Sequence, residues 1–145
     1  MAIDRNTFRD ALLARLEGSV SVQYATTRYL TSDDLTNQSK QPALVLRVDG
    51  YEPFNEEGCD TVWTLHFLVG LYVRNPDRSG SSDDTLNDLV DEVETALEVK
   101  VGEAGETQTT LGDICRRAWI DGTIEFEPGE LSDQAMATVP IAIEV

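Results

Sequence analysis

Hydrophobic and polar residues alternate almost without interruption from Asp60 to Arg74. The odd positions carry large apolar side chains: Trp63, Leu65, Phe67, Val69, Leu71 and Val73. Because side chains alternate between the two faces of a strand, this pattern predicts a long strand with one buried face. Leu68 and Tyr72 lie on the other face, so we expect that face to be partly covered, as in a central strand. The fold is expected to be organised around this strand.

The segment from Thr7 to Glu17 has the spacing of an amphipathic helix. Its apolar face is formed by Phe8, Leu12, Leu13 and Leu16. Asn6 or Thr7 is expected to cap the first turn, and Asp10 completes a capping-box spacing from Thr7. Gly18 is the expected left-handed residue after the last turn.

A second helix is predicted after the turn-forming segment 75–84. Its apolar stripe consists of Leu86, Leu89, Val90, Val93 and Leu97. Acidic residues occupy the other positions, and those in the first turn suit the helix dipole.

Four further segments alternate as strands do, at 20–24, 42–48, 118–127 and 135–145, and an acidic turn at 51–59 precedes the long strand. The third segment is interrupted at Asp121-Gly122. Pro140 lacks an N–H, so it should face a sheet edge or a bulge. The element order is therefore α-β-β-β-α-β-β. Short connections favour an α+β fold, with an antiparallel or mixed sheet of about five strands and two helices packed on one face.

The net charge is unusually negative, with 27 acidic and 11 basic residues giving −16. The first 50 residues hold six acids and six bases, so the whole excess follows residue 50. Such a chain is not expected to hold nucleic acid by counterion release. We favour a plain solvated surface; a channel wall that repels DNA and adaptation to a salty host are the alternatives.

The candidate chemistry is sparse. His66 is the only histidine, and we expect it to be a paired structural residue rather than a general base. Cys59 and Cys115 lack a CxxC spacing and are expected to be free, buried thiols. There is no nucleotide-binding glycine motif. We therefore expect no enzyme, no catalytic residues, no cofactor and no metal. No signal pattern or membrane span is recognised, which predicts a soluble protein made and used inside a cell.

Two polar segments, at about 25–41 and 99–113, are expected to be loops or arms on a single domain of residues 1–145. The first is either a flexible hairpin tip or an arm that docks on a neighbouring subunit through its few large apolar residues, Tyr29, Leu30 and Leu35. Arg116-Arg117 is the only basic doublet in the acidic part of the chain. It is either a solvent-exposed pair, which we favour, or a partner for acids in the same or the next subunit.

The order of these elements resembles the tail terminator, or tail completion, proteins of long-tailed viruses of bacteria and archaea, of the minor tail protein U type. The resemblance covers essentially the whole chain: the helix from Phe8 to Leu16, the polar arm, the strand entered through Pro42-Ala43-Leu44, the strand from Trp63 to Val73, the helix from Leu86 to Leu97 and the closing strand from Ala135 to Val145. It rests on layout, with no signature residue to transfer.

The resemblance implies a virion protein of the tail or neck, assembled in the host cytoplasm. It implies a homohexameric ring that caps the tail tube, stops its polymerisation and joins it to the head-side connector. The partners would be the tail tube protein and a head-completion protein, with DNA passing through the lumen without specific binding and with no membrane. The alternatives are another neck component, such as a head-closure or tail-tube-fitting protein, and a small α+β ligand-binding or regulatory domain.

Overall fold

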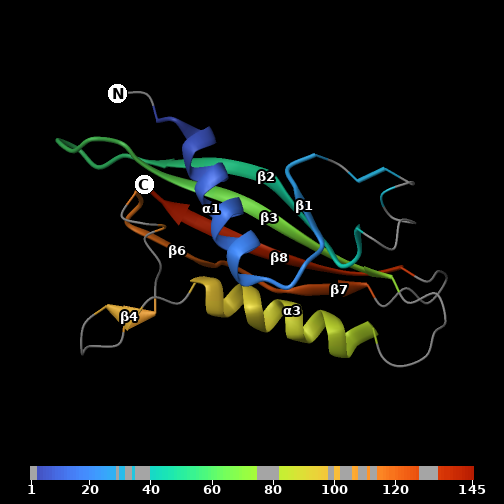
Figure 1. The fold of residues 1–145 in the computed structure, drawn as a ribbon. Helices are drawn as coiled ribbons and strands as arrows, with labels where there is room; N and C mark the ends of the chain where they lie inside the picture. The colour runs from blue at the N-terminus through green and yellow to red at the C-terminus, as the bar shows by residue number, and fades with distance from the viewer. Residues whose placement is uncertain are drawn as a thin grey trace.

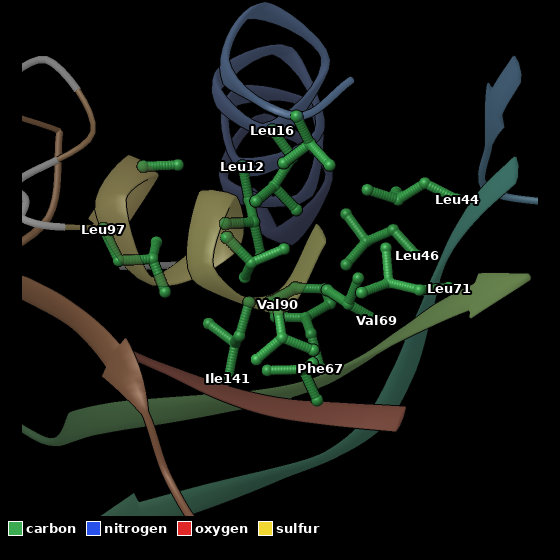
Figure 2. Packing of buried hydrophobic residues seen from close by; sticks show 14 of the residues in the cluster. Leu12, Leu16, Leu44, Leu46, Phe67, Val69, Leu71, Val90, Leu97 and Ile141 are labelled. Carbon is green, nitrogen blue, oxygen red and sulfur yellow. The ribbon is translucent and has the colours of Figure 1, made fainter. Parts of the chain in front are cut away.

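A computed structural model describes residues 3–28, 30, 31, 34, 40–74, 82–97, 100, 101, 106, 107, 111, 114–127 and 134–145. Helices α1 (Arg5–Ser19) and α3 (Ser82–Leu97) pack against the same face of a six-stranded sheet (Figures 1 and 2). A separate pair of short strands, β4 (Lys100–Val101) and β5 (Glu106–Thr107), follows α3. The expected α+β class is confirmed. Within the described residues, neither helix combines the length and apolarity that crossing a bilayer requires.

The long predicted strand is central in the sheet. The strand order is β1 (Tyr24–Thr26), β2 (Ala43–Phe54), β3 (Val62–Arg74), β8 (Gln134–Glu144) and β6 (Arg117–Ile120), and β7 (Glu125–Glu127) also pairs with β8. Among the described strands of this sheet, only the pairing of β1 with β2 is parallel, which makes the sheet mixed. β3 lies between β2 and β8 over almost its whole length, as its apolar pattern predicts.

The core lies between this sheet and the two helices (Figure 2). The predicted apolar face of β3 is buried from Leu65 to Val73, and Trp63 is partly buried. The predicted stripe of α3 is also buried, as are Phe8, Leu12 and Leu16 of α1. Figure 2 shows Leu12 and Leu16 approaching Phe67 and Ile141 from the helix side. Hydrophobic burial therefore fixes the relative position of helices and sheet.

Pro140 occupies the kind of position expected for a proline within a strand. β6 pairs with β8 from Ile141 onward, and β7 pairs with β8 up to Thr138, so Pro140 faces the gap between them. Gly122 lies in this gap with φ +131°, and a Cβ there would come within 3.2 Å of Pro140 Cγ. The interruption predicted at Asp121-Gly122 thus accommodates the proline ring where no N–H is available for pairing.

The predicted ends of α1 are wrong. The helix begins earlier, because the carboxylate of Asp4 accepts hydrogen bonds from the N–H groups of Asn6 and Thr7 at 3.2 and 3.3 Å. Asp10 pairs with Arg9 at 3.0 Å rather than capping the first turn. Gly18 stays within the helix, which ends at Ser19 and is followed by Val20 in an extended conformation. The buried side chain of Val20 keeps this end against the core.

The first strand lies further along the chain than predicted, at Tyr24–Thr26 instead of 20–24. Glu92 of α3 accepts hydrogen bonds from Ser21 N–H at 2.6 Å and from Ser21 Oγ at 2.9 Å. Because that N–H is engaged by a helix, the chain there does not join the sheet.

Candidate functional site

The hairpin formed by β2 and β3 extends past the rest of the sheet (Figure 1). β1 pairs with β2 only as far as Val45, and β8 ends its pairing with β3 at Thr64. The two hairpin strands stay in register with each other as far as Phe54 and Val62. Every residue from 51 to 61 is exposed. We call residues 48–62 the hairpin arm.

The hairpin arm replaces much of the turn predicted at 51–59. Val48 pairs with Phe67 and Gly50 pairs with His66, so Asp49 is an extra residue in a β-bulge. The bulge shifts the alternation of apolar and polar residues, and Pro53 adds a residue that is rare in strands. Both features conceal the strand in the sequence. The sequence feature that could have indicated this strand is the aromatic pair Tyr51 and Phe54, because aromatic residues favour strands over turns.

Arg5 anchors the base of the hairpin arm to helix α1. Its guanidinium carbon lies 4.7 Å from the ring centroids of both Tyr51 and Trp63. Such contacts contribute about 0.5–1 kcal/mol each at exposed sites. Since Arg5 is the first residue of α1, the stacking joins the helix start to Tyr51 in the arm and to Trp63, which directly follows the arm on β3.

His66 lies between two carboxylates on the face of the sheet opposite the helices. Its Nε2 is 3.3 Å from Glu52 Oε2, and its Nδ1 is 3.6 Å from Asp121 Oδ2. Glu52 belongs to the hairpin arm and Asp121 follows β6, so the imidazole of His66 links β3 to the hairpin arm and to the end of β6. The expected pairing of His66 is present, and its role as a structural residue rather than a general base stays a prediction.

A groove of about 730 Å³ lies between the hairpin arm and the end of β8. Its lining includes carboxylates from both sides, namely those of Glu52, Glu56, Asp60 and Glu144. Arg116 is the only basic residue among the described residues that line it. Phe54 and Val62 contribute apolar surface. The charged groups of the groove are thus mostly acidic, and the arm forms one of its sides.

The two arginines of the basic doublet have different environments. Arg117 forms an ion pair with Glu144 at 3.2 Å, and its guanidinium carbon lies 4.2 Å from the centroid of the Trp119 ring. Arg116 is exposed, and among the described residues its side chain forms no ion pair. One member therefore pairs within its own chain, and the other presents an available cation to the surface.

The other predicted interface residues lie in the 25–41 segment. Tyr29 and Leu35 fall outside the described residues, and Leu30 is partly buried. Lys40 donates a hydrogen bond to Asp34 at 2.6 Å, and this bond is the main reason that the pKa of Asp34 is lowered to about 2. Docking of this segment on a neighbouring subunit stays a prediction. Most of the predicted loop at 99–113 also lies outside the described residues.

Both cysteines are free, but the prediction that both are buried is wrong. Cys59 is exposed because it lies in the turn of the hairpin arm, whereas Cys115 is partly buried. Burial raises the pKa of the Cys115 thiol to about 11, which leaves it protonated and unreactive near neutral pH. In the described part of the chain, no group of histidines, cysteines and acids is arranged to hold a metal ion.

Comparison with known proteins identifies no family. No protein-family model and no curated protein matches the sequence. The solved structures with a similar fold include a chain from the virion of a native gene transfer agent particle. The two chains are 12% identical, the match covers 94% of this chain and 85% of that chain, and the TM-score is 0.49. At this level of similarity, the match carries no argument about function.

Proposed function

We propose that this protein is a structural virion protein, a tail terminator that forms a hexameric ring on the end of a tail tube. The ring stops tube polymerisation and joins the tube to the head-side connector. The observation that carries the proposal is the order of parts: α1, the β2–β3 hairpin with its long central strand, α3 and the closing strand β8. This is the layout in which the sequence resembles tail terminators of the minor tail protein U type.

The hairpin arm supports an assembly role. Ring-forming subunits of this size need surfaces that reach their neighbours, and the arm is an exposed projection with apolar and acidic side chains. Exposed apolar surface rimmed by polar residues is typical of protein–protein contacts. The negative charge also suits a conduit for DNA, because repulsion between carboxylates and phosphates disfavours adhesion.

The groove argues against the ligand-binding alternative. A small-molecule site is usually a mostly apolar concavity with a few polar groups. Here carboxylates are prominent in the lining, and the groove is bounded by an exposed arm. Another neck component remains the second candidate, since the same layout would serve a ring placed elsewhere between head and tail.

The decisive experiment measures tube growth. Purified tail tubes are incubated with this protein, and tube protein is then added while length is followed by electron microscopy. We expect a ring at one tube end and arrested growth at that end. Tubes that continue to lengthen at saturating protein would refute the terminator function. A ring that binds only the head-side connector would instead favour another neck component.

The 25–41 segment provides a second test of ring formation. Deleting most of it should leave the core folded, because the large buried side chains among the described residues lie outside it. The deletion should also weaken self-association. Native mass across a concentration range measures the effect, with far-UV circular dichroism as the folding control. Unchanged ring formation would show that the segment is not an intersubunit arm.

A further inference from the structure

Exposed large hydrophobic side chains in the described part of the chain gather at two opposite edges of the sheet. They are Val48, Tyr51 and Phe54 at the β2 edge, and Ile114 and Phe126 at the β6–β7 edge. Phe54 is the most exposed of them, at 63%. β2 beyond Val45 and the outer side of β6 have no strand partner among the described residues. Edges that carry apolar residues and lack a neighbour are typical contact surfaces.

The two edges are level with each other along the strand direction. Glu52 pairs with Thr64, Thr64 with Glu144, and Glu144 with Arg117, which forms one row across four strands. This row ends in an acid on the β2 edge and in a base on the β6 edge. Phe54 follows Glu52 in the hairpin arm, and Ile114 precedes Arg117 in the turn that leads into β6. We call residues 114–120 the β6 edge.

The charges of the two surfaces are complementary. The hairpin arm contains five acids and no base: Asp49, Glu52, Glu56, Glu57 and Asp60. The β6 edge contains Arg116-Arg117 and no acid. Arg117 is already paired with Glu144, whereas the exposed Arg116 has no ion pair among the described residues. Arg116 lines the groove of its own chain, yet its guanidinium retains donors for a carboxylate from outside.

We propose that copies of this chain associate head-to-tail, with the hairpin arm of one copy packed on the β6 edge of the next. Phe54 meets the apolar surface around Ile114, and Arg116 meets the carboxylates of the arm. Because the two surfaces differ, the contact is heterologous and generates a ring when the rotation closes. If the ring axis runs along the strands, the row that ends at Glu52 in one copy meets the row that ends at Arg117 in the next copy at the same height along the axis.

The contact is made by side chains rather than by an added strand. Pro53 has no N–H, and the bulge at Asp49 breaks the regular row of backbone groups on the β2 edge. Both features are known to oppose strand addition at sheet edges. They leave the apolar and charged side chains of the arm free to pack, which favours a closed assembly over unlimited growth of a sheet.

A charge exchange between the two edges tests this contact. Arg116→Glu and Glu52→Lys each place like charges opposite each other in every contact of a homogeneous assembly. We expect each variant alone to associate roughly tenfold more weakly than the wild type. In an equimolar mixture, alternating copies restore opposite charges at every contact, so assembly should recover. Arg9→Glu is the matched control, since it makes the same charge change on α1 and should have no effect.

Native mass spectrometry and sedimentation over a concentration range provide the measurement, and thermal unfolding confirms that the variants fold. Weakened single variants with a recovering mixture support the contact. A monomeric wild type at all concentrations, a fully assembled Arg116→Glu variant, or a mixture that fails to recover overturns it. The inference rests on the proposed ring but fails separately: a ring that still arrests tube growth in the Arg116→Glu variant excludes this contact and retains the function.

Discussion

Replacing Phe67 by alanine tests the central packing of the fold. Phe67 is 1% exposed and lies on β3 opposite Val48 and Ile141, beneath both helices. Truncating a fully buried phenylalanine removes transfer free energy and leaves a cavity, at a cost of about 3–5 kcal/mol. The total free energy of unfolding of such a domain is about 5–15 kcal/mol. We therefore expect Phe67→Ala to fold with much reduced stability and Phe67→Asp, which buries an unpaired charge, not to fold.

Urea unfolding followed by circular dichroism measures the effect. With a slope of about 2 kcal/mol per molar, the midpoint for Phe67→Ala should fall by roughly 2 M at unchanged slope. Leu68→Ala is the matched control, because Leu68 is the next residue but lies on the less covered face. Its partial burial predicts a loss of about 1–2 kcal/mol. Equal losses for the two variants, or a well-folded Phe67→Asp, would show that the faces of β3 are assigned wrongly.

Three further predictions follow from local geometry. Gly122→Ala should lower the free energy of unfolding by about 1–3 kcal/mol, because Gly122 has a φ of +131°. Gly18→Ala, in an open helical position, should raise it by about 0.5–1 kcal/mol. Thermal unfolding measures both, and the reverse order would contradict the backbone conformations assigned to the two glycines. A thiol reagent at pH 8 should label Cys59 at least about tenfold faster than Cys115 by peptide mass spectrometry; equal rates would contradict the raised pKa of Cys115. Because the folded pKa of Asp34 is lowered to about 2, its contribution to stability should be complete above about pH 4 and lost as the pH falls towards 2. An NMR titration midpoint near its ordinary value would exclude the lysine bond.

Segments with strict periodicity could be predicted from the sequence. β3, α3 and β8 each bury a continuous apolar face, and removing such a face from water is the main driving force for folding. Pro140 and the nearby Asp121-Gly122 break were also informative, because a missing N–H and a glycine restrict what the neighbouring strand can do. In these cases the local pattern and the tertiary structure agree.

The remaining features depend on contacts between distant residues. Glu92 takes the Ser21 N–H and so moves the start of β1 along the chain, which no local pattern indicates. The bulge at Asp49 conceals the outer half of β2, and with it the hairpin arm and the groove. The ion pair of Arg117 with Glu144 arises from the pairing of β6 with β8. Candidate sites of this kind become visible only when the register of the sheet is known.

The proposed contact bears on the meaning of the acidic charge. In a ring joined through the sheet edges, one face of every sheet points to the pore and the other points outward. The carboxylates of the hairpin arm are then opposed by Arg116 of the next copy. The carboxylates on the exposed side of α3 do not take part in this contact. They belong to Asp84, Asp88, Asp91 and Glu94. If α3 faces the ring axis, these acids line the pore and repel DNA. If α3 faces outward, these acids solvate the outer wall of the ring. The opposite face of the sheet, which carries Arg47, His66 and Arg74, then lines the pore.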